Sequence, residues 1–273
     1  MQETPPTVAK YLHSEGICLR RIPYSNTSQV ASFLTRDEGR LSFIAKGVTR
    51  APKRGVRTGF DLLGLYELVY TPRPPGMLQN LTDRSLREDF RDIRRSLRRI
   101  LCGYYAAELG LNFTMEGDPC PHLYELTIEV LRRLATGQRL GATMLQMELG
   151  VLGQHGTLPD FGACAVCGRG LPGRGAVTFS PAEGGPVCGR CEEPDRGRTL
   201  PVRADFLNAL QQVAGGGAVL DVPPQHIVSM SVVARFHIRY ILGKELRMWK
   251  YLQRRKLSRS LERVRHHARP RGE

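Results

Sequence analysis

The chain lacks long apolar runs and contains only one tryptophan in 273 residues. No stretch of roughly 18 apolar residues is present, so we expect no helix that spans a membrane. Residues 1–16 also lack the basic segment and the apolar core of a secretory signal peptide. We therefore expect a cytoplasmic protein with no membrane partner.

Familiar catalytic motifs are missing as well. The sequence has no G-x-x-x-x-G-K-[ST] phosphate loop, no H-E-x-x-H zinc-protease helix and no G-x-S-x-G nucleophile elbow. Glu88, Asp89 and Asp92 are interleaved with arginines, unlike the grouped carboxylates of a two-metal nuclease. We expect a binding protein and not an enzyme. A nuclease or a thiol oxidoreductase is the enzymatic alternative, and no set of residues supports either.

Acidic residues are few relative to basic ones. The chain has 40 lysines and arginines against 26 aspartates and glutamates, which gives a formal net charge of +14. A protein with this charge attracts polyanions such as DNA, RNA or an anionic membrane surface. Apolar residues make up 41% of the chain, which is enough to build folded cores.

The basic residues are concentrated in residues 43–60, which contain no acidic side chain. The five basic residues of this segment are Lys46, Arg50, Lys53, Arg54 and Arg57. Phosphate contacts are independent of sequence and need no fixed geometry, so a basic loop suits a nucleic-acid backbone. We predict that these five residues bind DNA and that Tyr24 stacks on bases. Phe33 and Phe43 are also aromatic, but strand alternation places them in the core.

Short alternating stretches before residue 71 predict β-strands. The expected strands are residues 17–22, 29–35, 40–47 and 60–71. Residues 37–40, which read Asp-Glu-Gly-Arg, predict the turn of a hairpin. Four or five short strands of this kind predict a small barrel or sandwich.

The pattern changes after Asn80. Apolar residues with helical spacing predict a helix over residues 81–109, with six arginines on its other face. These arginines are Arg87, Arg91, Arg94, Arg95, Arg98 and Arg99. We interpret them as a solvated face with local ion pairs, and a DNA-binding face is the alternative. Further helices are predicted over residues 122–137, 141–156, 203–216 and 229–253.

Four cysteines form the most specific motif of the chain. Cys164, Cys167, Cys188 and Cys191 have the spacing C-x2-C-x20-C-x2-C. Two residues between cysteines let both sulfurs of one turn reach the same ion, and two such turns complete a tetrahedral thiolate site. The pattern predicts a structural Zn²⁺, because four thiolates leave no position for a water. An iron–sulfur cluster and a redox dithiol are the alternatives.

These elements predict an α+β multidomain protein with a compact insert between helices. The expected parts are a strand-rich domain at residues 1–80, a helical domain at 81–158, a four-cysteine ribbon at 159–200, the rest of the helical domain at 201–255 and a basic tail at 256–273. We expect loss of the metal to unfold the ribbon alone, because the other cores are large enough to stand without it.

Several stretches resemble the bacterial recombination mediator family RecO. The resemblance rests on the Tyr-Ser-Asn-Thr-Ser stretch at residues 24–28, the T-x-x-x-G-R turn at 35–40 and the A-K-G-x-x-R stretch at 45–50. Residues 240–252 are also similar, and the likeness covers most of residues 8–255.

The resemblance implies an N-terminal OB-fold barrel, an α-helical domain and a zinc ribbon. It also implies a function in which the protein binds single- and double-stranded DNA at the nucleoid. Such a protein anneals complementary strands coated by single-strand-binding protein and helps RecR to load RecA. The family contacts the acidic C-terminal tail of single-strand-binding protein. The alternative function is a zinc-ribbon adaptor that binds nucleic acid in transcription or RNA metabolism.

Overall fold

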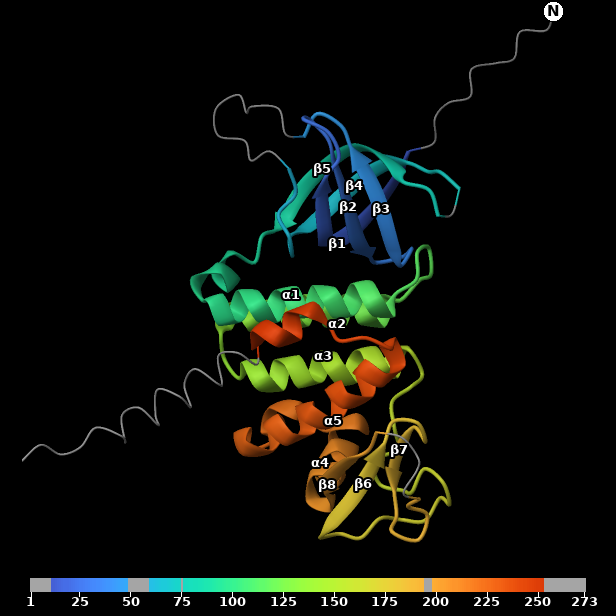
Figure 1. The fold of residues 1–273 in the computed structure, drawn as a ribbon. Helices are drawn as coiled ribbons and strands as arrows, with labels where there is room; N and C mark the ends of the chain where they lie inside the picture. Colours follow the sequence, from blue (N-terminus) through green and yellow to red (C-terminus); the bar gives the residue numbers. More distant parts are fainter. Residues whose placement is uncertain (1–10, 49–58, 75, 194–197, 253–273) are drawn as a thin grey trace, which may run out of the picture. The chain divides into compact units, whose positions relative to one another are not determined.

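The structure is a computed structural model that describes residues 11–48, 59–74, 76–193 and 198–252. The chain forms two compact units, and each of them is assembled from separate stretches of sequence (Figure 1). Unit 1 contains residues 1–91 and 110–132, and unit 2 contains residues 92–109 and 133–273. Within the described residues, no helix has both the length and the apolar content needed to cross a membrane.

Unit 1 is built on a closed five-stranded barrel with the strand order β1-β2-β3-β5-β4. Its strands are β1 (Leu12–Pro23), β2 (Gln29–Thr35), β3 (Arg40–Ala45), β4 (Leu65–Thr71) and β5 (Gln79–Glu88). Neighbouring strands are antiparallel except β3 and β5, which run parallel where Phe43 lies opposite Gln79. The four predicted strands and the predicted barrel are confirmed, although β1 and β4 begin at other residues than expected.

Aromatic rings fill the barrel. The ring of Phe33 is fully buried and meets the rings of Phe43, Phe60 and Tyr66 edge-on, at centroid distances of 5.6, 5.1 and 5.8 Å. Edge-to-face contacts place the positive rim of one ring against the negative face of another, which adds to the burial of apolar area. The expectation that Phe33 and Phe43 belong to the core is confirmed.

The helix predicted over residues 81–109 is wrong in its first half. Residues 79–88 form strand β5, which pairs with β4 and β3. A short 3-10 helix, η1 (Arg91–Arg95), follows, and α1 (Leu97–Phe113) begins only at Leu97. Phe90 separates strand from helix with a left-handed backbone (φ 43°) while its side chain is buried. The apolar spacing was real, but ladder pairing with two strands outweighed local helix propensity. The predicted domain ranges stay a prediction.

The turn between β2 and β3 depends on one glycine. Gly39 has a φ of 64°, and its carbonyl accepts hydrogen bonds from the N–H and the hydroxyl of Thr35, both at 2.7 Å. A Cβ at this position would lie 1.8 Å from the backbone oxygen of Asp118. The hairpin predicted at residues 37–40 is therefore confirmed, and its sharp turn has no room for a side chain.

We predict that Gly39→Ala destabilises unit 1 by more than the roughly 1–2 kcal/mol that a left-handed backbone costs an L-residue. The control is Gly47→Ala, because Gly47 has a similar φ of 73° but nothing within 4 Å of a Cβ. Urea unfolding of both variants measures the difference. Equal losses of stability would contradict a steric role for Asp118.

Unit 2 contains helices and a three-stranded sheet. The helices are the first part of α1, the end of α2 (Pro121–Thr136), α3 (Leu140–Gln154), α4 (Ala204–Ala214) and α5 (Pro224–Leu242), with a short 3-10 helix η2 (Val219–Asp221). The strands are β6 (Ala176–Ser180), β7 (Gly185–Val187) and β8 (Leu200–Arg203), in the antiparallel order β7-β6-β8.

The helices predicted at residues 122–137, 141–156 and 203–216 are confirmed. The helix predicted over residues 229–253 is interrupted, since α5 ends at Leu242 and Gly243 takes a left-handed conformation with a φ of 64°. The chain is helical again from Arg247 to Leu252. The carboxylate of Glu108 caps this last helix, accepting from the N–H groups of Arg247 and Met248 at 2.7 and 2.9 Å.

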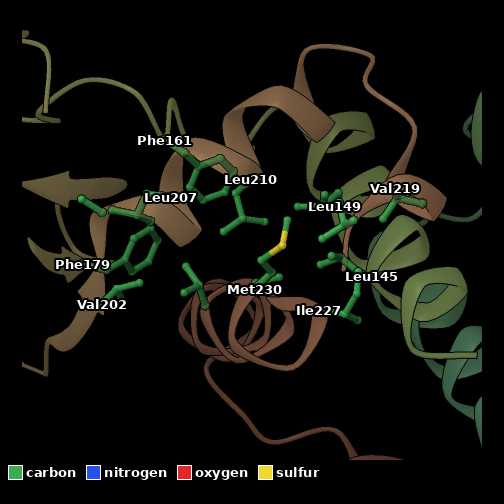
Figure 2. Packing of buried hydrophobic residues seen from close by; sticks show 14 of the residues in the cluster. Leu145, Leu149, Phe161, Phe179, Val202, Leu207, Leu210, Val219, Ile227 and Met230 are labelled. Carbon is green, nitrogen blue, oxygen red and sulfur yellow. The ribbon is translucent and has the colours of Figure 1, made fainter. Parts of the chain in front are cut away.

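The sheet and the helices of unit 2 share one hydrophobic core. Phe161 and Phe179 from the ribbon and Val202 from β8 pack in the same cluster as residues of α3, α4 and α5. In Figure 2 the side chain of Met230 points into the middle of this cluster, between Leu210 and Leu145. The ribbon is therefore not an appendage with a core of its own.

A buried ion pair lies beside this core. Glu148 on α3 is completely buried and pairs with Arg235 of α5. Burial raises the pKa of Glu148 from its usual value, and the positive charge of Arg235 opposes that rise. The guanidinium of Arg235 also lies 3.7 Å from the centroid of the Trp249 ring. These contacts join α3, α5 and the last described helix.

Candidate metal centre and nucleic-acid interface

The four motif cysteines occupy two tight turns on either side of the β6–β7 hairpin. Cys164 and Cys167 precede β6, and the N–H of Gly168 donates to the carbonyl of Cys164 at 2.8 Å. Gly168 has a φ of 71°, the left-handed conformation that favours glycine. Cys188 and Cys191 follow β7, and the N–H of Cys191 donates to the carbonyl of Cys188 at 2.8 Å. We call these two turns, residues 164–168 and 188–191, the first and the second knuckle.

The two turns bring all four sulfurs together. The Sγ atoms lie within 4.8 Å of one another, and those of Cys167 and Cys188 are 3.8 Å apart. A tetrahedral zinc with Zn–S bonds of about 2.3 Å holds its sulfurs roughly 3.8 Å apart. The cysteines are thus close enough to bind a metal ion, and the donor set is consistent with zinc. The predicted grouping of Cys164, Cys167, Cys188 and Cys191 is what the structure places here.

The pKa values of two of these thiols are shifted in opposite directions. Burial opposes ionisation of Cys164, but the backbone N–H groups of Cys188, Cys167 and Val166 outweigh burial and lower its pKa to about 6. Hydrogen bonds to the sulfurs of Cys167 and Cys188 raise the pKa of Cys191 to about 12. Four thiolates this close repel one another, and a dication at their centre would allow all four to ionise.

The other cysteines are isolated from this group. Cys18 and Cys102 are buried, with exposed fractions of 0% and 3%. Burial raises the pKa of the Cys18 thiol to about 12 and that of Cys102 to about 11. Cys120 is also buried. Such protonated thiols act as small apolar residues.

The predicted DNA-binding residues lie mostly outside the described residues. Arg50, Lys53, Arg54 and Arg57 belong to residues 49–58, and their structure is not described. Lys46 is exposed directly after β3, and Tyr24 is 65% exposed in the β1–β2 loop. Strand register brings these two together at one end of the barrel, because Pro23 pairs with Gln29 and Gln29 pairs with Ala45. Their role in DNA binding stays a prediction.

A groove of about 480 Å³ opens on the barrel next to Lys46. Arg84 of β5 lines it, and its guanidinium lies 4.5 Å from the centroid of the Phe60 ring. Asp61 and Asp83 also line the groove, so its walls carry both signs of charge. Arg84 was predicted to lie on a helix, so its place in this groove was not predicted. Pairing of residues 79–88 with β4 and β3 puts it there.

Several arginines of residues 87–99 have partners within the protein. Arg87 pairs with Glu67 at 2.7 Å, and Arg95 pairs with Asp92 at 2.9 Å. Arg99 donates to two carbonyls at the C-terminal end of α2, at 2.7 and 3.2 Å. Arg95 therefore has a local partner, as interpreted, whereas the Glu67 partner of Arg87 and the α2 carbonyls that accept from Arg99 lie far along the chain. The arginines are spread over a strand, a 3-10 helix and α1 rather than one helix face.

The fold and the site together define a class. An OB-like barrel, a helical unit and a four-cysteine ribbon make an α+β multidomain protein. Two family models match, described as "Recombination protein O N terminal" at residues 10–90 and "Recombination protein O C terminal" at residues 94–250. Together they span nearly all of the described residues.

Curated relatives agree with this match. A "DNA repair protein RecO" of an Anaeromyxobacter species is 34% identical over 202 residues, which are 74% of this chain and 78% of the relative. The protein of the same description from Rhodopirellula baltica is 32% identical over 213 residues, 78% and 77% of the two chains. That from Moorella thermoacetica is 32% identical over 201 residues, 73% of each. The chain belongs to the RecO family of DNA repair proteins.

We predict that the purified protein contains one tightly bound zinc and that Cys188→Ser abolishes its binding. The control is Cys120→Ser, which removes a thiol that has no part in the four-cysteine group. Metal content by elemental analysis, with absorption spectra to detect an iron–sulfur cluster, measures both. Full zinc content in Cys188→Ser would contradict the site.

We also predict that chelation loosens more than the ribbon. Because Phe161 and Phe179 share a core with Leu207 and Met230, disorder at the knuckles should spread into α4 and α5. Hydrogen exchange before and after chelation should show lost protection in residues 204–242 and unchanged protection in the barrel. Loss confined to residues 159–200 would instead support the expectation from sequence that the ribbon unfolds alone.

Proposed function

We propose that this protein is a recombination mediator that binds single- and double-stranded DNA and anneals complementary strands coated by single-strand-binding protein. The proposal rests on membership of the RecO family over both halves of the chain. Its partners are DNA, RecR and the acidic tail of single-strand-binding protein, and RecA benefits indirectly. It acts in the cytoplasm, at the nucleoid.

Charge and fold support this proposal. A formal net charge of +14 attracts the phosphate backbone. OB-folds bind oligonucleotides on the face of strands 2 and 3 and through neighbouring loops, with basic side chains for phosphates and aromatic ones for bases. Lys46 and Tyr24 are exposed at one end of this barrel, and Arg50, Lys53, Arg54 and Arg57 extend the basic segment along the sequence.

Annealing needs no catalytic residue. Two complementary strands repel each other through their phosphates, and a cationic protein lowers that repulsion and raises their local concentration. Base pairing then supplies the driving force. We therefore infer that the protein is not an enzyme and that its Zn²⁺ is structural, held by Cys164, Cys167, Cys188 and Cys191.

The test is annealing of complementary strands that are pre-coated with single-strand-binding protein. The loop variant changes Lys46, Arg50, Lys53, Arg54 and Arg57 to Ala. The control variant changes five tail residues to Ala, namely Arg259, Arg263, Arg265, Arg269 and Arg271. Both variants lose five positive charges, so they separate the position of the charge from its amount.

We expect the wild type and the tail variant to anneal and the loop variant to fail while remaining folded. Five phosphate contacts correspond to a slope of roughly −3.5 in log K against log[salt] on single strands, at about −0.7 per contact. The loop variant should lose most of this slope. No annealing by the wild type, together with binding to RNA, would favour the zinc-ribbon adaptor instead.

A further inference from the structure

The knuckle end of the ribbon carries three exposed arginines. Arg169 follows the first knuckle in the sequence Cys-Gly-Arg, and Arg190 lies inside the second in the sequence Cys-Gly-Arg-Cys. Arg174 lies in the chain that leads into β6. The side chains of all three are exposed.

Strand register places these arginines at the same end of the hairpin. Thr178 of β6 lies opposite Val187 of β7, so the chain entering β6 and the chain leaving β7 are neighbours. Arg174 is on the entering chain and Arg190 is on the leaving chain. Arg169 is fixed to the same end, since its carbonyl accepts from the N–H of Cys164 at 2.8 Å.

Some other surface arginines have a carboxylate partner. Arg36, Arg132 and Arg239 each pair with a glutamate, at 3.2, 3.0 and 3.0 Å. Among the described residues, neither Arg169 nor Arg174 nor Arg190 has an ion pair with a carboxylate. Glu192 and Glu193 directly follow the second knuckle, and Glu192 accepts a hydrogen bond from the Thr178 hydroxyl at 2.6 Å. The ribbon thus presents guanidinium groups that no carboxylate of the described chain neutralises.

Main-chain hydrogen bonds hold the turns at Arg169 and Arg190. Both knuckles are closed by main-chain hydrogen bonds, and their sulfurs converge within 4.8 Å. A zinc–tetrathiolate group is itself anionic, and part of the positive charge offsets it. All three side chains are exposed and therefore accessible to a ligand from solvent. A guanidinium fork on a fixed backbone matches the oxygens of a phosphate.

We propose that Arg169, Arg174 and Arg190 form a second phosphate-binding surface, which contacts the backbone of DNA separately from the barrel loop. This inference rests on the proposed function, because it needs a protein that binds DNA. It gives one chain two places at which strands are held, which is what bringing two strands together requires.

The test measures binding of a labelled oligothymidine by fluorescence anisotropy over a range of salt concentrations. The ribbon variant changes Arg169, Arg174 and Arg190 to Gln. The control variant changes Arg36, Arg132 and Arg239 to Gln, which removes the same charge from residues that have glutamate partners. A third variant changes Arg174 alone, since it lies outside both knuckles and leaves the metal ligands and their neighbours intact. Zinc content is measured for each.

We expect the ribbon variant to reduce the salt slope by about 2, at about 0.7 for each lost contact, and Arg174→Gln to reduce it by about 0.7. The control variant should keep the wild-type slope. Unchanged slopes in the ribbon variant and in Arg174→Gln, with a wild type that still anneals coated strands, would overturn this inference and leave the proposed function standing.

Two other results would also overturn it. If the ribbon variant releases zinc and Arg174→Gln binds DNA like the wild type, the arginines serve only to offset the thiolates. If the ribbon variant keeps its DNA slope but loses binding to a labelled acidic peptide, the surface belongs to a protein partner. A wild type that binds no DNA at all would instead refute the proposed function.

Discussion

The barrel closes through a single strand, β5, which hydrogen-bonds to β4 along its length and to the end of β3. Without it, β3 and β4 would each expose a row of unpaired N–H and C=O groups. The groove beside Lys46 is lined by residues of β3, β4 and β5, including Ala45, Tyr66 and Leu81. Closure therefore creates both the core around Phe33 and the groove beside Lys46.

The sequence allowed the local features to be predicted. The hairpin at residues 37–40, the cysteine knuckles and three of the helices follow from signals within a few residues of each other. Residues 81–88 were placed on a helix because Leu86, Phe90 and Ile93 share its spacing, while their actual positions are a strand, a turn and a 3-10 helix. These residues form a strand because they pair with the open edges of β3 and β4. Those edges lie far from residues 81–88 in the sequence, so a local sequence window does not contain them.

The same difference between local and long-range information applies to the metal centre. Ligand spacing predicted which four sulfurs converge, since each pair lies within one turn. It gave no sign that Phe161 and Phe179 are buried against α4 and α5, because that packing depends on residues far along the chain. Nor did it distinguish arginines with partners from arginines without them. The sequence near Arg36 does not predict its partner, because Glu125 lies far along the chain and the fold brings the two together.

The shared core of unit 2 also limits which mutations such a protein can accumulate during evolution. The cysteines of the ribbon are suited to bind a metal, whereas its apolar residues cover the side of the helical core that contains Leu207 and Met230. Mutations that remove the ligands one by one would loosen this cover and, with it, α4 and α5, unless tighter packing around Phe161, Phe179 and Val202 replaced the metal. Deleting the β6–β7 hairpin would expose this apolar side of the helical core to water. Descendants that abandon the metal should therefore keep a ribbon-shaped, apolar cover in its place.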